Sequence, residues 1–144
     1  MTGREATVSY EFPVEWGKIR EFATAAMSDN PAYQAPDAVV PPTFLIAAAN
    51  FWAAPADDPG ARLGFDMRRV LHAEEEYIFH GPPPRAGETL VASARLGERY
   101  EKEGKRGGRM RFAVLVTEFR DRSGVLAAER RTTVVETARP PAEG

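Results

Sequence analysis

The sequence predicts an α+β fold in which a curved antiparallel sheet wraps around one central apolar helix. Residues 43–54 are apolar on most of their helical circumference, with Phe44, Ala48 and Phe51 at helical spacing. Most of the segments after this run alternate between apolar and polar residues, which is typical of strands. The 144 residues fit one domain with an ordinary core, so this helix and these strands are expected to share it.

The central helix is expected to begin at Thr43, which can accept an orphan backbone amide as N-cap after Pro41 and Pro42. Pro55 ends the run. A helix that is apolar on nearly every side must be buried, and its alanines allow a sheet to approach closely. The run is too short and too rich in alanine to span a bilayer, so no membrane insertion is expected.

The chain before the central helix is expected to supply one strand and one helix. Residues 6–12 alternate and are rich in β-branched and aromatic types, which favours a strand ended by Pro13. Residues 15–27 follow helical periodicity. Residues 28–31 are typical of a turn, and a proline-rich loop over residues 32–42 leads to the central helix.

The chain after the central helix is expected to form four strands as a meander. A rigid proline turn, a charged hairpin tip and a polar turn separate them. The expected strands cover residues 72–80, 90–100, 110–116 and 125–136, and the connections cover residues 81–88, 101–108 and 121–124.

This order of elements is that of the hot-dog architecture, expected over residues 1–138 and followed by a flexible tail at residues 139–144. A lone hot-dog sheet leaves an edge strand uncovered, so a dimer is expected.

The bulk composition excludes several kinds of site. There are no cysteines, which rules out disulfides and thiolate metal sites, and the two histidines are too few for a histidine-based metal site. No metal or cofactor is therefore expected. A net charge of −2 gives no general attraction to nucleic acid or anionic lipid. No charged and then apolar leader segment opens the chain, so a cytoplasmic location is expected.

Several stretches resemble one enzyme family when they are taken in this order. They are residues 19–33, the Pro41-Pro42-Thr43-Phe44 entry to the central helix, residues 70–77 and residues 80–90. Together they are similar to the MaoC-like R-specific hydratases and dehydratases, and in particular to their FAS1-like dehydratase N-terminal-type branch. That branch includes the accessory subunits of (3R)-hydroxyacyl-ACP dehydratases. The resemblance covers residues 14–137 and implies an acyl-CoA or acyl-carrier-protein thioester as ligand.

In that family the catalytic segment reads Gly-Asp-x-Asn-Pro-hydrophobic-His, and its Asp and His hold the water or proton that adds across an enoyl thioester. Here only Asn30 stands between Asp29 and Pro31, so the segment reads as one residue short. Tyr33 occupies the histidine position, and a phenol that titrates near ~10 is a poor general base at neutral pH. The resemblance therefore implies a degenerate, inactive pair at Asp29 and Tyr33.

Further positions take their roles from the same resemblance. Asn30, Pro42, Thr43 and Phe44 are the expected substrate-binding residues, with a backbone amide at the start of the central helix polarising the thioester carbonyl. Each also has a structural interpretation, since Asp29 can cap the turn, Tyr33 can anchor the loop and Phe44 can belong to the core.

Other polar residues leave two interpretations open. His72 and His80 are expected on the same face of one strand, either supporting the sheet or replacing the missing base. The cations of the hairpin tip either bind CoA or carrier-protein phosphates or form a solvated turn. These cations are Lys102, Lys105, Arg106 and Arg109.

Three functions remain in competition at this point. The first is the non-catalytic subunit of an R-specific enoyl-thioester hydratase or (3R)-hydroxyacyl-thioester dehydratase, paired with a MaoC-like catalytic partner. The second is a self-sufficient hot-dog hydratase or thioesterase that forms a dimer with itself. The third is an acyl-thioester binding protein without catalysis. A fold does not decide among them.

Overall fold

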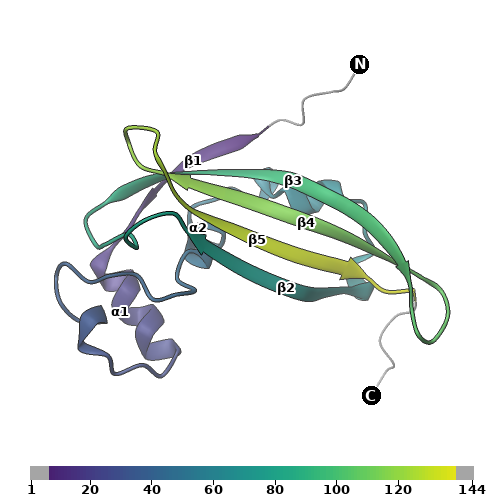
Figure 1. Cartoon of the computed structure of the whole chain (residues 1–144), viewed down its shortest axis with the longest axis horizontal. Coiled ribbons are helices and arrows are strands. Elements are labelled where there is room, and N and C mark those ends of the chain that lie inside the picture. Colours follow the sequence, from purple (N-terminus) through teal and green to yellow (C-terminus); the bar gives the residue numbers. More distant parts are fainter. Residues whose placement is uncertain (1–6, 139–144) are drawn as a thin grey trace.

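The computed structural model describes residues 7–138 and contains one curved, five-stranded antiparallel sheet with helical segments on one face (Figure 1). The flexible tail expected at residues 139–144 and the first residue of the strand expected from residue 6 lie outside the described residues. The strands are β1 (Val8–Pro13), β2 (Val70–Phe79), β3 (Thr89–Glu103), β4 (Arg109–Arg120) and β5 (Leu126–Glu136).

The strand order β1-β3-β4-β5-β2 corrects one prediction about topology. Only β3, β4 and β5 form a meander, while β2 pairs with β5 at the far edge and not with β3. The connection between β2 and β3 contains Pro82, Pro83 and Pro84, which cannot form a tight hairpin. It runs from the β2 edge of the sheet past β5 and β4 to β3. This crossing leaves β1 and β2 as the two edge strands.

The central helix is shorter than expected. Helix α2 covers Ile46–Phe51, and the preceding residues form tight turns in which the Phe44 amide donates to Pro41 O. The N-cap is Leu45, without a side-chain hydrogen bond, so the prediction of Thr43 as N-cap was wrong. Its burial is also one-sided, because Ala47 and Ala48 are buried whereas Phe51 is 65% exposed.

Helix α1 (Trp16–Ala25) buries Ile19 and Ala23, and Met27, two residues after its end, has a left-handed backbone conformation. The Ser28 amide donates to Ala23 O, and Met27 between them has φ of +58°. This is the geometry of a helix end that glycine usually provides. A short 3-10 turn, η1 (Pro31–Tyr33), follows at once.

The core lies between the sheet and the segments that lead into α2. The ring of Phe12 in β1 is fully buried and lies 6.0 Å from Phe44, 5.2 Å from Trp52 and 6.0 Å from Phe119 in β4. We call this side of the sheet the helix face and the other side the open face. The pairing of strands places Ala94, Thr117, Arg130 and Tyr77 in one row across the helix face.

Residues 53–69 run across the helix face in three 3-10 turns, η2 (Pro55–Asp57), η3 (Pro59–Arg62) and η4 (Met67–Arg69). The buried carboxylate of Glu136 fixes the end of this segment, because it accepts a 2.6 Å hydrogen bond from the Asp66 amide and pairs with Arg69 and Arg111. These bonds lower the pKa of Glu136, and the hydrogen bond from the Asp66 amide is the largest cause.

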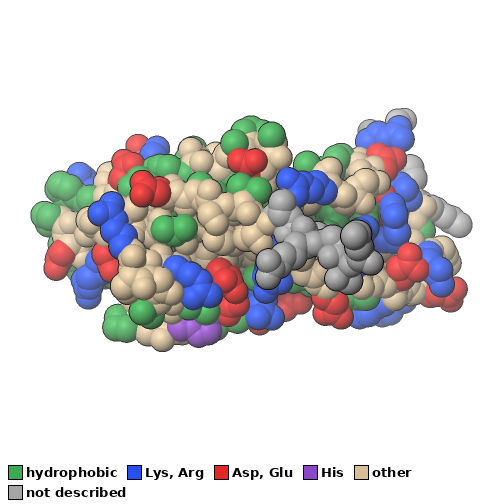
Figure 2. Space-filling view, turned by 90° about the horizontal axis from the view of Figure 1, so that it is seen from above, with side chains coloured by type: hydrophobic (Ala, Val, Ile, Leu, Met, Phe, Trp, Pro, Cys, Tyr) green, Lys and Arg blue, Asp and Glu red, His purple; other side chains and the backbone are tan. Residues whose placement is uncertain are grey.

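On the surface drawn in Figure 2, basic and acidic side chains are interspersed rather than segregated by sign. Within residues 7–138, no helix is both long enough and apolar enough to cross a membrane.

Candidate functional site

The loop that resembles the hydratase motif is held by Asn30. Its side-chain oxygen accepts a 3.0 Å hydrogen bond from the Ala32 amide, and its own amide lies 3.4 Å from Ser28 Oγ. The expectation that Asp29 caps this turn was therefore wrong. The Asp29 carboxylate is exposed and makes no hydrogen bond or ion pair with any residue in the described part of the chain.

The other residues expected at this site do not form one cluster. Tyr33 is half-buried and packs against the core. Phe44 is fully enclosed, with the ring of Phe22 at 5.6 Å in an edge-on contact. Pro42 and Thr43 are exposed. The structure thus gives Phe44 a packing role and leaves substrate binding by Pro42 and Thr43 as a prediction.

The two histidines lie on opposite faces of the sheet, which corrects the expectation that they share one. A bulge at Ala73 shifts the register of β2 and reverses the alternation of its side chains. His72 Nε2 lies 2.8 Å from Glu75 Oε2 on the helix face. His80 Nε2 lies 2.9 Å from Glu129 Oε2 on the open face, and this hydrogen bond is the main cause of the lowered pKa of Glu129.

A cavity of about 470 Å³ lies between the helix face and the segment from α2 to η3. Residues 49–59 form one wall, where small apolar side chains stand beside Asn50, Asp57 and Asp58, and the strands supply the other wall. The lining residues are Tyr10, Ala49, Asn50, Ala53, Ala54, Pro55, Asp57, Asp58, Pro59, Ala94, Leu115, Thr117, Arg130 and Thr132. Its size is that of a small-molecule site.

The polar wall continues into a network that the sequence analysis missed. Arg130 Nε donates a short hydrogen bond to Glu75, and Thr132 Oγ1 donates to the other carboxylate oxygen of Glu75 at 2.9 Å. Burial raises the pKa of Tyr77 and of Tyr10, and the Arg130 guanidinium opposes this in both. One sequence signal could have indicated this network. Glu75, Arg130 and Thr132 are polar residues at strand positions whose side chains point to the helix face, where apolar residues are expected.

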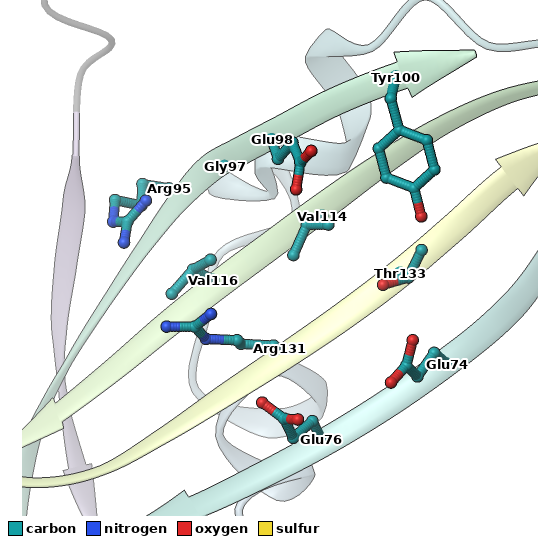
Figure 3. A pocket seen from close by; sticks show the side chains of 10 residues that line it. All are labelled: Glu74, Glu76, Arg95, Gly97, Glu98, Tyr100, Val114, Val116, Arg131 and Thr133. Carbon is teal, nitrogen blue, oxygen red and sulfur yellow. The ribbon is translucent and has the colours of Figure 1, made fainter.

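A second pocket, of about 320 Å³, lies on the open face of the sheet (Figure 3). Its side chains come from β2, β3, β4 and β5, and the helical segments lie behind the strands in that view. Glu74, Glu76, Glu98, Arg95 and Arg131 all line it, so both signs of charge are present. It lacks the apolar wall that an acyl group needs. Among residues 7–138, no group of three or more acidic or histidine side chains is arranged to hold a metal ion.

The expected anion site at the hairpin between β3 and β4 stays a prediction. Lys105 and Arg106 are exposed at its tip, whereas Arg109 pairs with Glu101 at 3.1 Å. Lys102 lies over the stacked rings of Tyr100 and Phe112.

Comparison with known proteins identifies the family from the sequence. Residues 1–130 match the family model described as the FAS1-like dehydratase domain region. The chain is 32% identical over 149 residues to a UPF0336 protein of Parafrankia sp. (strain EAN1pec), across 96% of this chain and 93% of that protein. It is also 32% identical to a UPF0336 protein of Streptomyces coelicolor, across 67% and 69%.

Solved structures agree on the fold. A chain of the C-terminally truncated HadBC (3R-hydroxyacyl-ACP dehydratase) complex from Mycobacterium tuberculosis superimposes with a TM-score of 0.72 at 23% identity, over 90% of this chain and 94% of that one. The ChsH1-ChsH2 complex from the same organism gives 0.67 at 21% identity, over 98% and 87%. At these identities the likeness establishes the hot-dog fold alone. The family match shows that this chain belongs to the FAS1-like dehydratase domain family.

Proposed function

We propose that this chain is the non-catalytic subunit of an R-specific enoyl-thioester hydratase or (3R)-hydroxyacyl-thioester dehydratase. It binds part of the acyl group, and a MaoC-like partner with an intact Asp and His performs the chemistry. The ligand is an acyl-CoA or acyl-carrier-protein thioester. The observation that carries this proposal is the geometry of the loop at Met27–Tyr33.

That geometry favours a register of the motif without a deletion. If Asn30 and Pro31 hold the Asn-Pro positions, counting back puts Met27 in the glycine position and Ser28 in the aspartate position. Met27 has φ of +58°, the conformation that glycine adopts most readily. Counting forward puts Tyr33 in the histidine position. Both catalytic groups are then replaced, and Asp29 falls on the variable position.

The two histidines of the chain are paired elsewhere: His72 is bonded to Glu75 and His80 to Glu129, on opposite faces of the sheet. The cavity beside α2 offers a site for part of an acyl group, since Ala49, Ala53 and Ala54 leave space along an apolar wall. The edge strands β1 and β2 each have a free side that supports assembly with a second hot-dog subunit.

The test is enoyl-CoA hydration by the purified chain alone and by the chain with a co-encoded MaoC-like protein. We expect hydration of crotonyl-CoA and longer enoyl-CoA esters with the partner only. The variant Ser28→Asp with Tyr33→His restores the motif in the proposed register, and Asp29→Asn is its control. Strong activity of the chain alone that Asp29→Asn abolishes would overturn both the accessory role and the register.

One observation favours a self-sufficient hydratase or thioesterase as a second candidate. His72 and Glu75 form an imidazole–carboxylate pair, and Glu75 also bonds to Thr132 on the cavity wall. Such a pair can activate water. If the chain alone hydrolyses or hydrates acyl-CoA and His72→Gln removes that activity while His80→Gln does not, this candidate replaces the first.

A further inference from the structure

The sheet-side wall of the cavity is unusual for a site that would hold only a hydrocarbon chain. Arg130, Thr132 and Thr117 line it from β4 and β5, opposite Ala49 of α2 and the alanines at positions 53 and 54. The Arg130 side chain is 14% exposed, so its guanidinium is largely removed from water. A largely buried guanidinium needs partners for its charge. Whether those partners neutralise the charge decides whether the cavity favours an anionic or a neutral ligand.

The charge of Arg130 is already balanced. Its Nε donates to Glu75, whose side chain is 17% exposed, and Thr132 and His72 complete the shell of that carboxylate. Tyr77 also hydrogen-bonds to Arg130 and Glu75. An arginine carries five N–H donors, so these partners still leave donor capacity on a residue that lines the cavity. The sheet-side wall is therefore nearly neutral in charge but keeps unused N–H donors on Arg130.

The rest of the lining disfavours an anion. Asp57 and Asp58 lie in η2 and directly after it, on the side of the cavity opposite the sheet, and Asp58 Oδ1 accepts from the Gly60 amide. A carboxylate inside the cavity would meet these two acidic side chains and a guanidinium that is already neutralised. A hydroxyl or ketone oxygen would accept a hydrogen bond from Arg130 without that repulsion.

We propose that the cavity selects acyl groups bearing a neutral oxygen substituent, a hydroxyl or a ketone away from the thioester, and that Arg130, positioned by Glu75 and Thr132, recognises this oxygen. The apolar part of the acyl group then lies against Ala49, Ala53 and Ala54. This inference rests on the proposed function, because it takes the cavity to be an acyl site.

The experiment measures binding of three CoA thioesters to the full chain by titration calorimetry. They are octanoyl-CoA, its omega-hydroxy derivative and its omega-carboxy derivative. We expect the hydroxy compound to bind roughly tenfold more tightly than octanoyl-CoA, as one hydrogen bond to a charged donor requires. The carboxy compound should bind no better than octanoyl-CoA.

The informative variant is Arg130→Met with Glu75→Gln, which removes the donor without leaving an unpaired buried carboxylate. We expect it to bind octanoyl-CoA and the hydroxy compound equally. Arg131→Met is the matched control, because Arg131 is the next residue, lies on the open face and is 46% exposed. It should keep the tenfold preference. Thr132→Val, which is nearly isosteric, removes the hydrogen bond that holds Glu75 and with it the position of Arg130. It should reduce the preference, and it is the variant to measure if the double variant does not fold.

The outcomes separate the two proposals. Equal binding of octanoyl-CoA and the hydroxy compound by the unaltered chain overturns the oxygen selectivity alone. A preference for the carboxy compound overturns it as well. If none of the three thioesters binds, the acyl site itself is refuted and the proposed function fails with it.

Discussion

Replacing the left-handed Met27 by glycine should stabilise the protein, although it deletes an entire side chain. Met27 is 92% exposed and has φ of +58°, so its side chain contributes little packing while its Cβ strains the backbone. Relief of that strain is worth roughly 1–2 kcal/mol, and the greater entropy of glycine in the unfolded chain offsets about 0.5–1 kcal/mol. The net expectation is a gain of about 0.5–1 kcal/mol, or roughly 1–4 °C in Tm.

Calorimetry and urea unfolding of three variants test this reasoning. Met27→Ala keeps the Cβ and should change stability little. Ala25→Gly puts the same residue at the last helical position of α1, where it should cost up to about 0.5–1 kcal/mol. If Met27→Gly destabilises the protein as Ala25→Gly does, Met27 does not carry strain, and the argument that it occupies the glycine position of the motif loses its support.

Three further predictions follow from packing, capping and charge. Phe12→Ala should cost about 3–5 kcal/mol because the ring is fully buried among three others; a loss below about 1 kcal/mol in urea unfolding would contradict the packing described here. Asn30→Ala should cost about 1 kcal/mol through the lost cap, whereas Asp29→Ala should be neutral by the same measurement, and the reverse order would restore Asp29 as the cap. The pKa of Glu136 is lowered from 4.5, so its stabilising effect is present above that pH and is lost as pH falls through the lower folded value. Glu136→Gln should therefore lower the urea midpoint at neutral pH and flatten the decline of that midpoint as the pH falls below 4.5, and an unchanged pH profile would refute this.

The strands were predictable because their side chains alternate, and each expected strand is present with boundaries that differ by a few residues. Their pairing was not predictable from local pattern. The choice of β5 rather than β3 as the partner of β2 depends on where the proline-rich connection leads. The same limit applies to α2, because composition indicates an apolar helix but not that only one side of it meets the sheet.

The sequence predicted the motif loop of the candidate site but not the side chains that the fold brings together around the cavity. Periodicity assigned His72 and His80 to one face, and a single bulged residue, Ala73, separated them. The cavity wall depended on residues that lie about 55 positions apart in the sequence, Glu75 and Arg130, and only the sheet register brings them together. Local sequence cannot report such pairs.

The pairing of β2 with β5 also constrains how the protein acquires its structure. Between the synthesis of β2 and that of its partner, the chain must produce the whole β3–β4 hairpin, and during that time β2 has no neighbour. Long-range closure of this kind slows folding and leaves an unprotected strand that can aggregate. A nascent chain stalled after Ser123 should therefore bind chaperones through β2, and release of the remaining residues should end that binding.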